Sequence, residues 1–424
     1  MASREGDARG APRPLSVDEA LDYILSRIQP LDSQPVAITQ ALDRVLAADV
    51  VSGVDVPPFV NSAMDGYAVR AADVAGATPR TPAVLKVTGE VPAGQQAKGP
   101  LTPGGAMRIM TGAPLPLESD AVVPFEQTDQ GRTQVRILRA VRAGDHVRQA
   151  GEDIRQGQLL LPAGHALRPA DVGVLAAIGC ASVSVVRQPR VAILATGDEL
   201  VDVSEAAGPG QIRNSNEYTS VALVARYGGI PLPLGIARDT SESLVAKLQE
   251  GLSQQADLFL TSAGVSVGDF DMVKTVLATQ GEMHFWQVAM KPGKPLAFGS
   301  IGGVPLLGLP GNPVAAMVAF EVFARPAILK LSGRTDWRKP SVTATLDEDV
   351  HNSGRRHYMR ARVRREADGY HVSTRGSTVN VQGSGILSSL VWANGLVVVP
   401  ETVTFIPAGS PVQVWMLDWP ECVF

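Results

Sequence analysis

Apolar residues near the start of the chain follow a helical period. Within residues 15–28 they recur every three or four positions, which predicts an amphipathic helix. These positions are Leu21, Ile24, Leu25 and Ile28. Ser16 and Glu19 have the spacing of a capping box, so the helix should begin there. The stretch TQALDRVLAADV at 39–50 predicts a second helix.

Residues 187–331 have a different pattern, in which short apolar runs alternate with amphipathic stretches. The predicted strands are VAILA, PLPLGIA, DLFLT, HFWQVAM and PLLGL. Helical patterns lie between most of them, and a long helix should begin at Pro313. This alternation predicts a three-layer α/β domain with a parallel sheet. Such sheets bind their ligands outside the carboxyl ends of the strands.

The flanking segments have β-type patterns. Pro-Gly turns separate short runs such as AVLKV and TQVRIL in residues 50–144, which predicts a small inserted β domain. Residues 338–424 contain SVTATL, YMRARVRRE, YHVSTR, LVVVP and VQVWML between turns, and predict a C-terminal, barrel-like β domain. Residues 145–186 return to helix and short strand. We expect them to join residues 15–49 in a helical linker domain.

Composition limits the class of protein. With 424 residues, 45% of them hydrophobic, the chain should form several globular domains. Its net charge of −4 disfavours a nucleic-acid partner, and its two cysteines and scattered histidines disfavour disulfides or zinc. Residues 1–14 predict a disordered tail and not a signal peptide. The longest apolar run, 172–186, is shorter than the about 20 residues that span a membrane. We therefore expect a cytoplasmic protein without a membrane segment.

Three loops after the α/β strands carry polar residues with two interpretations each. Thr196 and Glu199 follow VAILA with a spacing that fits a capping box or a site. Asp239 follows PLPLGIA, where it either caps the next helix or binds a ligand. The loop 261–271 is rich in hydroxyl groups and glycine and ends at Asp271, so it is either a plain turn or an anion cradle. Its candidate binding residues are Ser262, Gly264 and Ser266.

Two rigid turns are the sharpest candidates. LPGNP at 309–313 fits the start of a helix, because Asn312 suits the N-cap and Pro313 the first turn, and helix N-termini also bind anions. Its candidate binding residues are Pro310, Gly311 and Asn312. Upstream, MKPGKP places Lys291 and Lys294 between prolines and a glycine. Such a turn aims both ammonium groups at an anionic ligand, and the alternative is a solvated surface turn.

At the carboxyl ends of the predicted strands, carboxylates therefore lie near loops that suit an anionic ligand. Glu199, Asp239 and Asp271 cannot bind an anion directly, and carboxylates beside phosphate groups imply Mg²⁺ between them. We expect Mg²⁺ as the cofactor, with these three residues as its ligands.

Six short motifs occur in the order found in one known family. They are NSAMDGYA (61–68), MTGAP (110–114), TGDEL (196–200), GVSVG (264–268), KPGKP (291–295) and PGNP (310–313). Each motif is weak alone, but six in register across residues 15–424 are specific. The chain therefore resembles the MoeA family of molybdopterin molybdenumtransferases, which includes the C-terminal region of gephyrin.

The resemblance implies an elongated homodimer of four-domain subunits, whose α/β domain is shared with molybdopterin adenylyltransferases. Members of the family insert molybdate into adenylated molybdopterin with a divalent cation and release AMP. Their active site lies between the α/β domain of one subunit and the β domain of its partner, to which Asp65 and Thr111 correspond. The positions that match family site residues are Asp65, Thr111, Glu199, Asp239, Asp271, Lys291, Lys294, Arg355 and Ser384. The molybdopterin adenylyltransferase and molybdoenzyme chaperones are implied as further partners.

The sequence departs from the family pattern at two positions, and three alternative functions compete with the molybdenumtransferase. Ala263 stands where the family often has glycine, and its methyl group should narrow the loop only slightly. Ala315 stands where the family often has serine, so molybdate binding should depend more on backbone N–H groups, Lys294 and Arg355. A molybdopterin adenylyltransferase is disfavoured by the additional domains, and a gephyrin-like scaffold without catalysis by the retained acidic and basic residues. A tungstate-specific enzyme stays open, because tungstate and molybdate have nearly the same size and charge.

Overall fold

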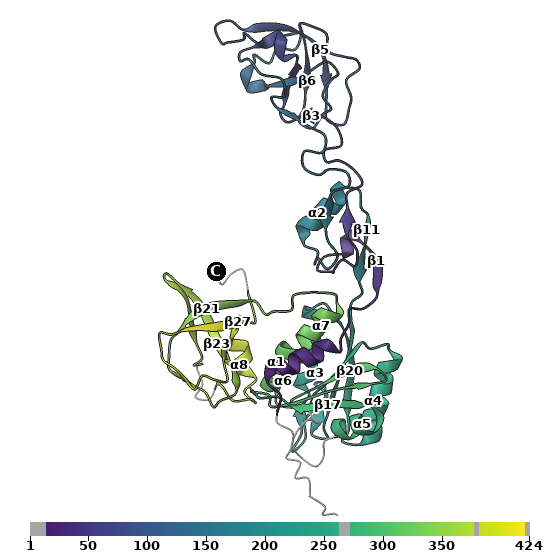
Figure 1. The fold of residues 1–424 in the computed structure, drawn as a ribbon, viewed down its shortest axis with the longest axis vertical. Coiled ribbons are helices and arrows are strands. Elements are labelled where there is room, and N and C mark those ends of the chain that lie inside the picture. Colours follow the sequence, from purple (N-terminus) through teal and green to yellow (C-terminus); the bar gives the residue numbers. More distant parts are fainter. Residues whose placement is uncertain (1–13, 263–271, 377–380, 420–424) are drawn as a thin grey trace, which may run out of the picture. The chain divides into compact units, whose positions relative to one another are not determined.

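The computed structural model describes residues 14–262, 272–376 and 381–419. The chain divides into two compact units. The first comprises Met1–Gln34, Asp43–Ala47 and Ser184–Phe424, and the second comprises Pro35–Leu42 and Ala48–Val183. Figure 1 shows the elements of both units.

The first unit contains a six-stranded sheet with the order β15-β12-β16-β20-β19-β17. Its strands are β12 (Arg190–Thr196), β15 (Ile230–Ala237), β16 (Leu258–Ser262), β17 (Glu282–Gln287), β19 (Pro295–Ile301) and β20 (Val304–Leu309). The first four strands of the order run parallel, as predicted. β19 and β17 are instead antiparallel neighbours at one edge. Gly302 and Gly303, both at positive φ, connect β19 to β20 in a tight hairpin, which is too short for a parallel crossover.

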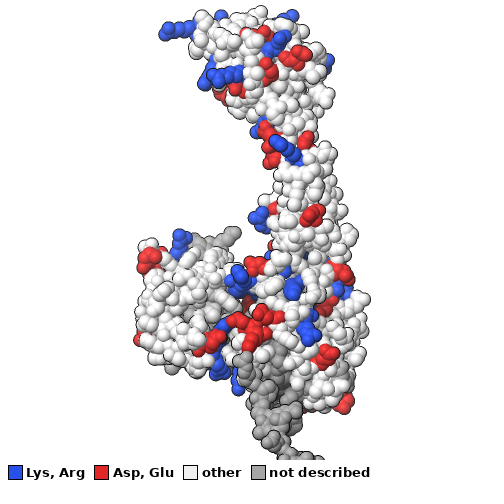
Figure 2. All heavy atoms as spheres, viewed as in Figure 1, with Lys and Arg blue, Asp and Glu red and all other residues white. Residues whose placement is uncertain are grey.

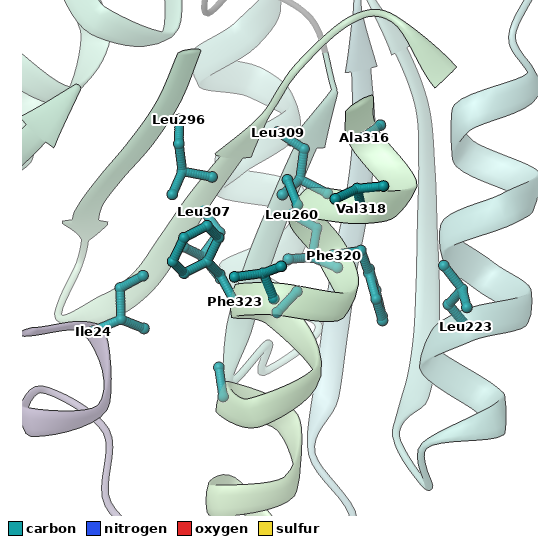
Figure 3. Packing of buried hydrophobic residues seen from close by; sticks show 14 of the residues in the cluster. Ile24, Leu223, Leu260, Leu296, Leu307, Leu309, Ala316, Val318, Phe320 and Phe323 are labelled. Atoms are coloured by element: carbon teal, nitrogen blue, oxygen red, sulfur yellow. The ribbon is translucent and has the colours of Figure 1, made fainter. Parts of the chain in front are cut away.

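Helices cover both faces of this sheet. Val191 and Ile193 of β12 point into one core, and Ala192 and Leu194 into the other. The helices of the first core are α1 (Val17–Ser26), α3 (Ser215–Arg226), α6 (Pro313–Ala319) and α7 (Arg325–Leu331), and those of the second are α4 (Ser241–Ser253) and α5 (Met272–Gln280). Figure 3 shows part of the first core, where Phe320 belongs to the same cluster as the strand residues. The three-layer α/β class is confirmed.

The two helices predicted at 15–28 and from Pro313 are present. The capping box of α1 forms as predicted, with Ser16 N 2.8 Å from Glu19 Oε2. α1 packs against α7, and its buried residues join the first core. Between α6 and α7 the chain forms a π-helical turn, η4 (Phe320–Ala324).

The prediction of a helix at 39–50 is wrong. Only the 3-10 turn η1 (Ile38–Gln40) forms there. The N–H of Ala47 donates to Ser184 O at 2.9 Å, and this long-range bond replaces a helical one. Asp43 has a φ of 62°, which is incompatible with a right-handed helix.

The C-terminal residues form a closed five-stranded barrel, which confirms the barrel-like prediction. In order around the barrel, the strands are β23 (Arg356–Glu366), β24 (Gly369–Ser373), β21 (Ser341–Leu346), β27 (Pro411–Met416) and β25 (Gly395–Val399), and β25 pairs with β23. Met359, Ala361 and Val363 alternate along β23 and fill the interior. The short strand β18 (Met290–Lys291) pairs with the first residues of β23 and so joins the α/β domain to the barrel. The remaining elements of this unit are α8 (Ser388–Trp392), β13 (Leu200–Val201), β14 (Ile212–Arg213), β22 (Val350–His351) and β26 (Phe405–Ile406).

The second unit is built around a five-stranded sheet with the order β7-β4-β6-β5-β8. Its strands are β4 (Gly66–Val69), β5 (Ala83–Val91), β6 (Gly105–Ile109), β7 (Ala121–Pro124) and β8 (Gln134–Ile137). Tyr67 and Ala68 point into separate cores on the two faces of this sheet. Two-stranded pairs form between β3 (Asn61–Ser62) and β9 (Val147–Arg148) and between β2 (Val50–Val51) and β10 (Leu159–Leu161). β1 (Ser33–Ala37) pairs with β11 (Ser182–Val186), and each of these two strands has residues in both units. The other elements are α2 (Pro169–Ala177), η2 (Ala71–Val74) and η3 (Phe125–Gln127).

Acidic and basic side chains are interspersed on the face drawn in Figure 2. Within the part of the chain that the structure describes, no helix has the length and apolar character needed to cross a membrane.

Candidate active site

A cleft of about 1000 Å³ opens at the carboxyl ends of the parallel strands, where the α/β domain meets the barrel. α/β folds bind their ligands at this end of the sheet, beyond the carboxyl ends of the strands. The predicted site residues that line it are Glu199, Ser262, Lys291, Lys294, Pro310, Gly311, Asn312, Arg355 and Ser384. The structure thus brings together residues that lie up to 185 positions apart in the sequence, from Glu199 to Ser384.

The two lysines of the cleft lie on a turn that is held at both ends. β18 pairs with β23 at Lys291, and the N–H of Val288 donates to Lys294 O at 3.0 Å. The Lys291–Pro292 peptide bond is cis, and Gly293 has a φ of 97°, a conformation that favours glycine. Lys291 is half-buried and Lys294 is exposed. The turn is therefore part of the cleft wall and not a free surface segment.

Arg355 and Ser384 enter the cleft from the barrel. Arg355 Nη1 lies 3.5 Å from Met290 O, so the guanidinium is beside the lysine turn. Asn312 Nδ2 donates to Ser384 Oγ at 3.1 Å, and Val314 N donates to Ser384 O at 3.2 Å. Asn312 occupies the N-cap position of α6 as predicted, but its side chain makes no capping bond and binds the barrel instead.

The predicted carboxylates are placed differently from one another. Glu199 lines the cleft, and Asp239 does not. Asp239 exchanges two bonds with Asp198: the N–H of each donates to the carboxylate of the other at 3.3 Å. Asp271, together with Gly264 and Ser266, lies outside the described residues.

The helix-cap interpretations of Glu199 and Asp239 are wrong. β12 continues through Thr196, and a turn and β13 follow it in place of a helix. α4 is capped by Thr240, whose hydroxyl accepts the N–H of the residue three positions on. Asp198, Glu199 and Asp239 therefore carry carboxylates at the ends of β12 and β15 that no helix requires.

One group of possible metal ligands in the described ranges lies elsewhere. Glu366, Asp368 and His371 have ligand atoms within 4.8 Å of one another on the β23–β24 hairpin of the barrel. His371 Nε2 is 3.0 Å from Asp368 Oδ1, and Arg364 Nε is 2.7 Å from Glu366 Oε1. Because these groups already form surface ion pairs, the hairpin needs no metal to explain it.

Asp65 and Thr111 contact each other in the second unit. Asp65 Oδ1 accepts from the Thr111 N–H at 2.7 Å and from its hydroxyl at 2.8 Å. The hydrogen bond from the backbone of Thr111, followed by that from its side chain, lowers the pKa of Asp65. Both residues are exposed, so an ionised and oriented carboxylate faces solvent there.

The sequence prediction missed one wall of the cleft. Residues 212–216 (IRNSN) line it, and Asn216 Nδ2 donates to Gly311 O at 2.7 Å. The available signal was a polar run before a helix, but ordinary capping also explains it, because Asn214 caps α3. Gln382 was missed too, since its place in the cleft depends on contacts far apart in sequence.

The fold and the cleft define a multidomain α/β protein whose cleft at the strand ends is lined by two lysines and an arginine. Comparison with known families assigns each part of the chain. Residues 15–179 match the family described as the MoeA N-terminal region (domain I and II), residues 192–330 the probable molybdopterin binding domain, and residues 343–417 the MoeA C-terminal region (domain IV).

Individual relatives match nearly the whole chain. It is 39% identical to a molybdopterin molybdenumtransferase of Nostoc sp. over 423 residues, which cover 96% of both chains. It is 39% identical to molybdopterin molybdenumtransferase 2 of Mycobacterium tuberculosis, with 90% of this chain and 94% of the relative covered. A crystal structure of the molybdopterin biosynthesis MoeA protein from Pyrococcus horikoshii has a TM-score of 0.82 and 32% identity, covering 96% of this chain and 100% of that one. The chain belongs to the MoeA family.

Proposed function

We propose that this chain is a molybdopterin molybdenumtransferase, which inserts molybdate into adenylated molybdopterin and releases AMP. The observation that carries this proposal is the convergence of Lys291, Lys294 and Arg355 in one cleft at the strand ends. Molybdate is a tetrahedral dianion, and rigid cations with neighbouring N–H and O–H donors complement it. Relatives named for this activity match nearly the full length, which supports it over an adenylyltransferase or a scaffold without catalysis.

In the proposed mechanism the protein binds and orients its two substrates. Molybdate lies against Lys291, Lys294 and Arg355, with Ser384 as a further donor, and the substrate's pyrophosphate lies in the strand-end loops. Water cleaves the P–O bond of the pyrophosphate and gives AMP and the pterin phosphate. This cleavage is coupled to ligation of molybdenum by the two dithiolene sulfurs, which replace an oxo ligand of molybdate that leaves as water with the two thiol protons. No protein nucleophile is needed, and Cys180 is not among the cleft residues. Positioning and charge complementarity are the protein's contributions.

The carboxylates at the ends of β12 and β15 are groups of the type that a hard divalent cation binds. Asp198 and Asp239 bond each other's backbone, and Glu199 follows directly in the chain. Carboxylate oxygens are the ligands that Mg²⁺ prefers. Glu199 and Asp239 would hold the ion, and Asp271 joins them on the basis of the resemblance. Bound there, Mg²⁺ would offset the negative charge of the pyrophosphate.

The first test measures AMP release from adenylated molybdopterin at increasing molybdate. Losing one charged hydrogen bond to the oxyanion costs about 1.5–3 kcal/mol, which is about 10- to 150-fold in affinity. We expect the half-saturating molybdate concentration to rise by this factor in Lys294→Ala and Arg355→Ala, and less in Lys291→Ala. Lys247→Ala is the control, because it removes a half-buried lysine that pairs with Glu250 on α4 and does not line the cleft.

Ala315 offers the opposite change. It is buried in the cleft wall, so Ala315→Ser adds a hydroxyl there and should lower the half-saturating concentration.

Unchanged half-saturation in both Lys294→Ala and Arg355→Ala would place molybdate elsewhere. A wild-type chain that releases no AMP with molybdate or with tungstate would refute the activity, and release with tungstate alone would identify the tungstate-specific alternative.

The second test concerns the metal. Removing Mg²⁺ with a chelator should abolish AMP release, and Asp239→Asn should raise the half-saturating Mg²⁺ concentration about 10-fold. Stability should be unaffected, because Asp239 caps no helix. Asp336→Asn is the control, since this exposed carboxylate binds only its local backbone at Arg338. A wild-type Mg²⁺ response in Asp239→Asn would remove this residue from the metal site.

We also infer that the chain acts in the cytoplasm as a homodimer, with Asp65 and Thr111 completing the cleft of the partner copy. The hydrogen-bonded and exposed Asp65–Thr111 pair supports this, because it presents an oriented carboxylate on a unit other than the one that holds the cleft. In this scheme a molybdopterin adenylyltransferase supplies the substrate, and molybdoenzyme chaperones receive the product.

A further inference from the structure

A fully buried guanidinium lies behind one wall of the cleft. Arg360 on β23 has an exposed fraction of 0% and is the largest fully buried side chain among the described residues. Its neighbours Met359 and Ala361 belong to the barrel interior. Because successive side chains of a strand point to opposite faces, Arg360 points out of the barrel, toward residues 381–389, here named the barrel loop.

Arg360 binds both ends of the barrel loop. Its Nη2 donates to Val381 O at 2.6 Å and to Gly383 O at 3.0 Å, and its Nε donates to Ser389 Oγ at 3.2 Å. The backbone of Arg360 also exchanges two bonds with the side-chain amide of Gln382, at 3.1 and 2.8 Å. The planar fork of a guanidinium suits this set of acceptors, which a single ammonium cannot reach.

The same loop forms the barrel side of the cleft. Gln382, Gly383 and Ser384 line the cleft. Ser384 is bonded on its other side by Asn312 and Val314 of α6. The position of the Ser384 hydroxyl therefore depends on two anchors, which are the start of α6 and Arg360.

The charge of Arg360 is not balanced by any carboxylate in the described part of the chain. Its bonded partners are all neutral oxygen atoms, and Nη1 is buried without a partner there. Burial lowers the pKa of Arg360 to about 10, so the group is still charged at neutral pH. A buried charge without a counter-ion costs stability, and proteins keep such departures mainly where function requires them.

We propose that Arg360 is a positioning residue of the oxyanion site: it holds the barrel loop where Ser384 can donate to molybdate, and its unbalanced charge attracts the dianion. The inference rests on the proposed function, which makes molybdate a ligand of the cleft. Arg360 is not among the residues that line the cleft. Its effect therefore falls on binding of the oxyanion and not on binding of the pterin substrate.

The test titrates molybdate alone into the full-length protein by calorimetry and follows hydrogen–deuterium exchange of the barrel loop without ligand. Arg360→Met removes the charge and the donors, and we expect a molybdate Kd about 10-fold higher or more, with faster exchange of the loop. Ser389→Ala keeps the charge and removes one acceptor, so its Kd should rise about 2- to 5-fold. Arg362→Met is the matched control: it removes the same charge from the same strand, but its side chain is exposed and donates to Trp392 O.

Kinetics separate this role from a general structural one. In the AMP-release assay, Arg360→Met should raise the half-saturating molybdate concentration and leave the KM for adenylated molybdopterin nearly unchanged. A similar rise in both, an unchanged molybdate Kd, or an equal rise in Arg362→Met would overturn the proposal. If Arg360→Met does not fold, Ser389→Ala decides, and an unchanged Kd there overturns it as well. A wild-type protein that binds no molybdate refutes the proposed function, and this inference with it.

Discussion

His357 shows how the cations around the cleft act on one side chain. It is 3% exposed, and neither ring nitrogen has a hydrogen-bond partner within the described ranges. Burial, followed by the charges of Lys291, Arg360 and Arg355, lowers its pKa to about 4. The imidazole is therefore neutral at pH 7 and adds no fourth buried charge beside these three cations.

The neutral state of His357 should make the first unit less stable as the pH falls. An unfolded chain protonates this histidine near pH 6.5, and the folded chain does so only near pH 4. Between these values the unfolded state binds more protons, so the free energy of unfolding decreases with falling pH. At pH 5 this loss is about 2 kcal/mol relative to pH 7. His357→Leu should lack it.

Urea unfolding at pH 7 and pH 5 measures the difference. All five tryptophans lie after residue 184, so their fluorescence reports on the first unit alone. His351→Leu controls for the loss of a histidine, because its ring is exposed. If wild-type protein and His357→Leu lose the same stability between the two pH values, the histidine is not held neutral.

At the scale of elements, a buried polar cluster ties η4 to the segment that leads into the barrel. Lys339 Nζ donates to Glu321 Oε2 and to the Tyr227 hydroxyl, both at 2.7 Å. The side chains of Lys339 and Glu321 are 4% and 2% exposed. Arg325 donates to two backbone carbonyls of the same segment. Burial lowers the pKa of Lys339, and the neighbouring Glu321 carboxylate opposes this shift.

Breaking this cluster should destabilise the first unit. Glu321→Gln leaves the Lys339 charge buried without a counter-ion, and we expect a loss of about 3–5 kcal/mol in the free energy of unfolding. The double variant Glu321→Leu with Lys339→Met removes both charges and should recover most of the loss. Glu250→Gln, which breaks the exposed pair with Lys247, should cost less than about 1 kcal/mol. Tryptophan-monitored urea unfolding compares the four proteins, and a Glu321→Gln variant as stable as Glu250→Gln would show that the pair does not stabilise the fold.

Elements with one buried face could be predicted from local periodicity. SVTATL predicts a strand at 341–346, and β21 spans Ser341–Leu346. The amphipathic stretch at 15–28 likewise becomes α1. TQALDRVLAADV also has a helical pattern, but its backbone pairs with residues more than 100 positions away, and local propensity cannot show this.

The candidate site likewise contains some residues that the sequence could place and others that it could not. The cations of KPGKP could be placed, because rigid turns and the rule for ligands at strand ends are both visible in the sequence. The bond from Asn312 to Ser384 could not, since its partner lies 72 positions away. Arg360 could not either: nothing local distinguishes it from Arg362, and only the tertiary fold buries one and exposes the other.

At the scale of the whole molecule, the site motifs are divided between the two units. Asp65 and Thr111 belong to the second unit, and the cleft with Lys294 belongs to the first. The proposed homodimer pairs the motif of one copy with the cleft of the other. It therefore predicts which substitutions share a site and which do not.

Mixed dimers test this arrangement. Asp65→Asn and Lys294→Ala chains should each be nearly inactive at low molybdate. In a heterodimer with a shared site, one site carries both substitutions and the other carries neither. Random exchange makes about half of the dimers mixed, so about a quarter of all sites should be intact and activity should return to about a quarter of the wild-type value. If each chain forms its own site, every site carries one substitution and no activity returns. Native mass spectrometry of differently tagged chains verifies the exchange, and verified exchange without recovered activity would exclude the shared site.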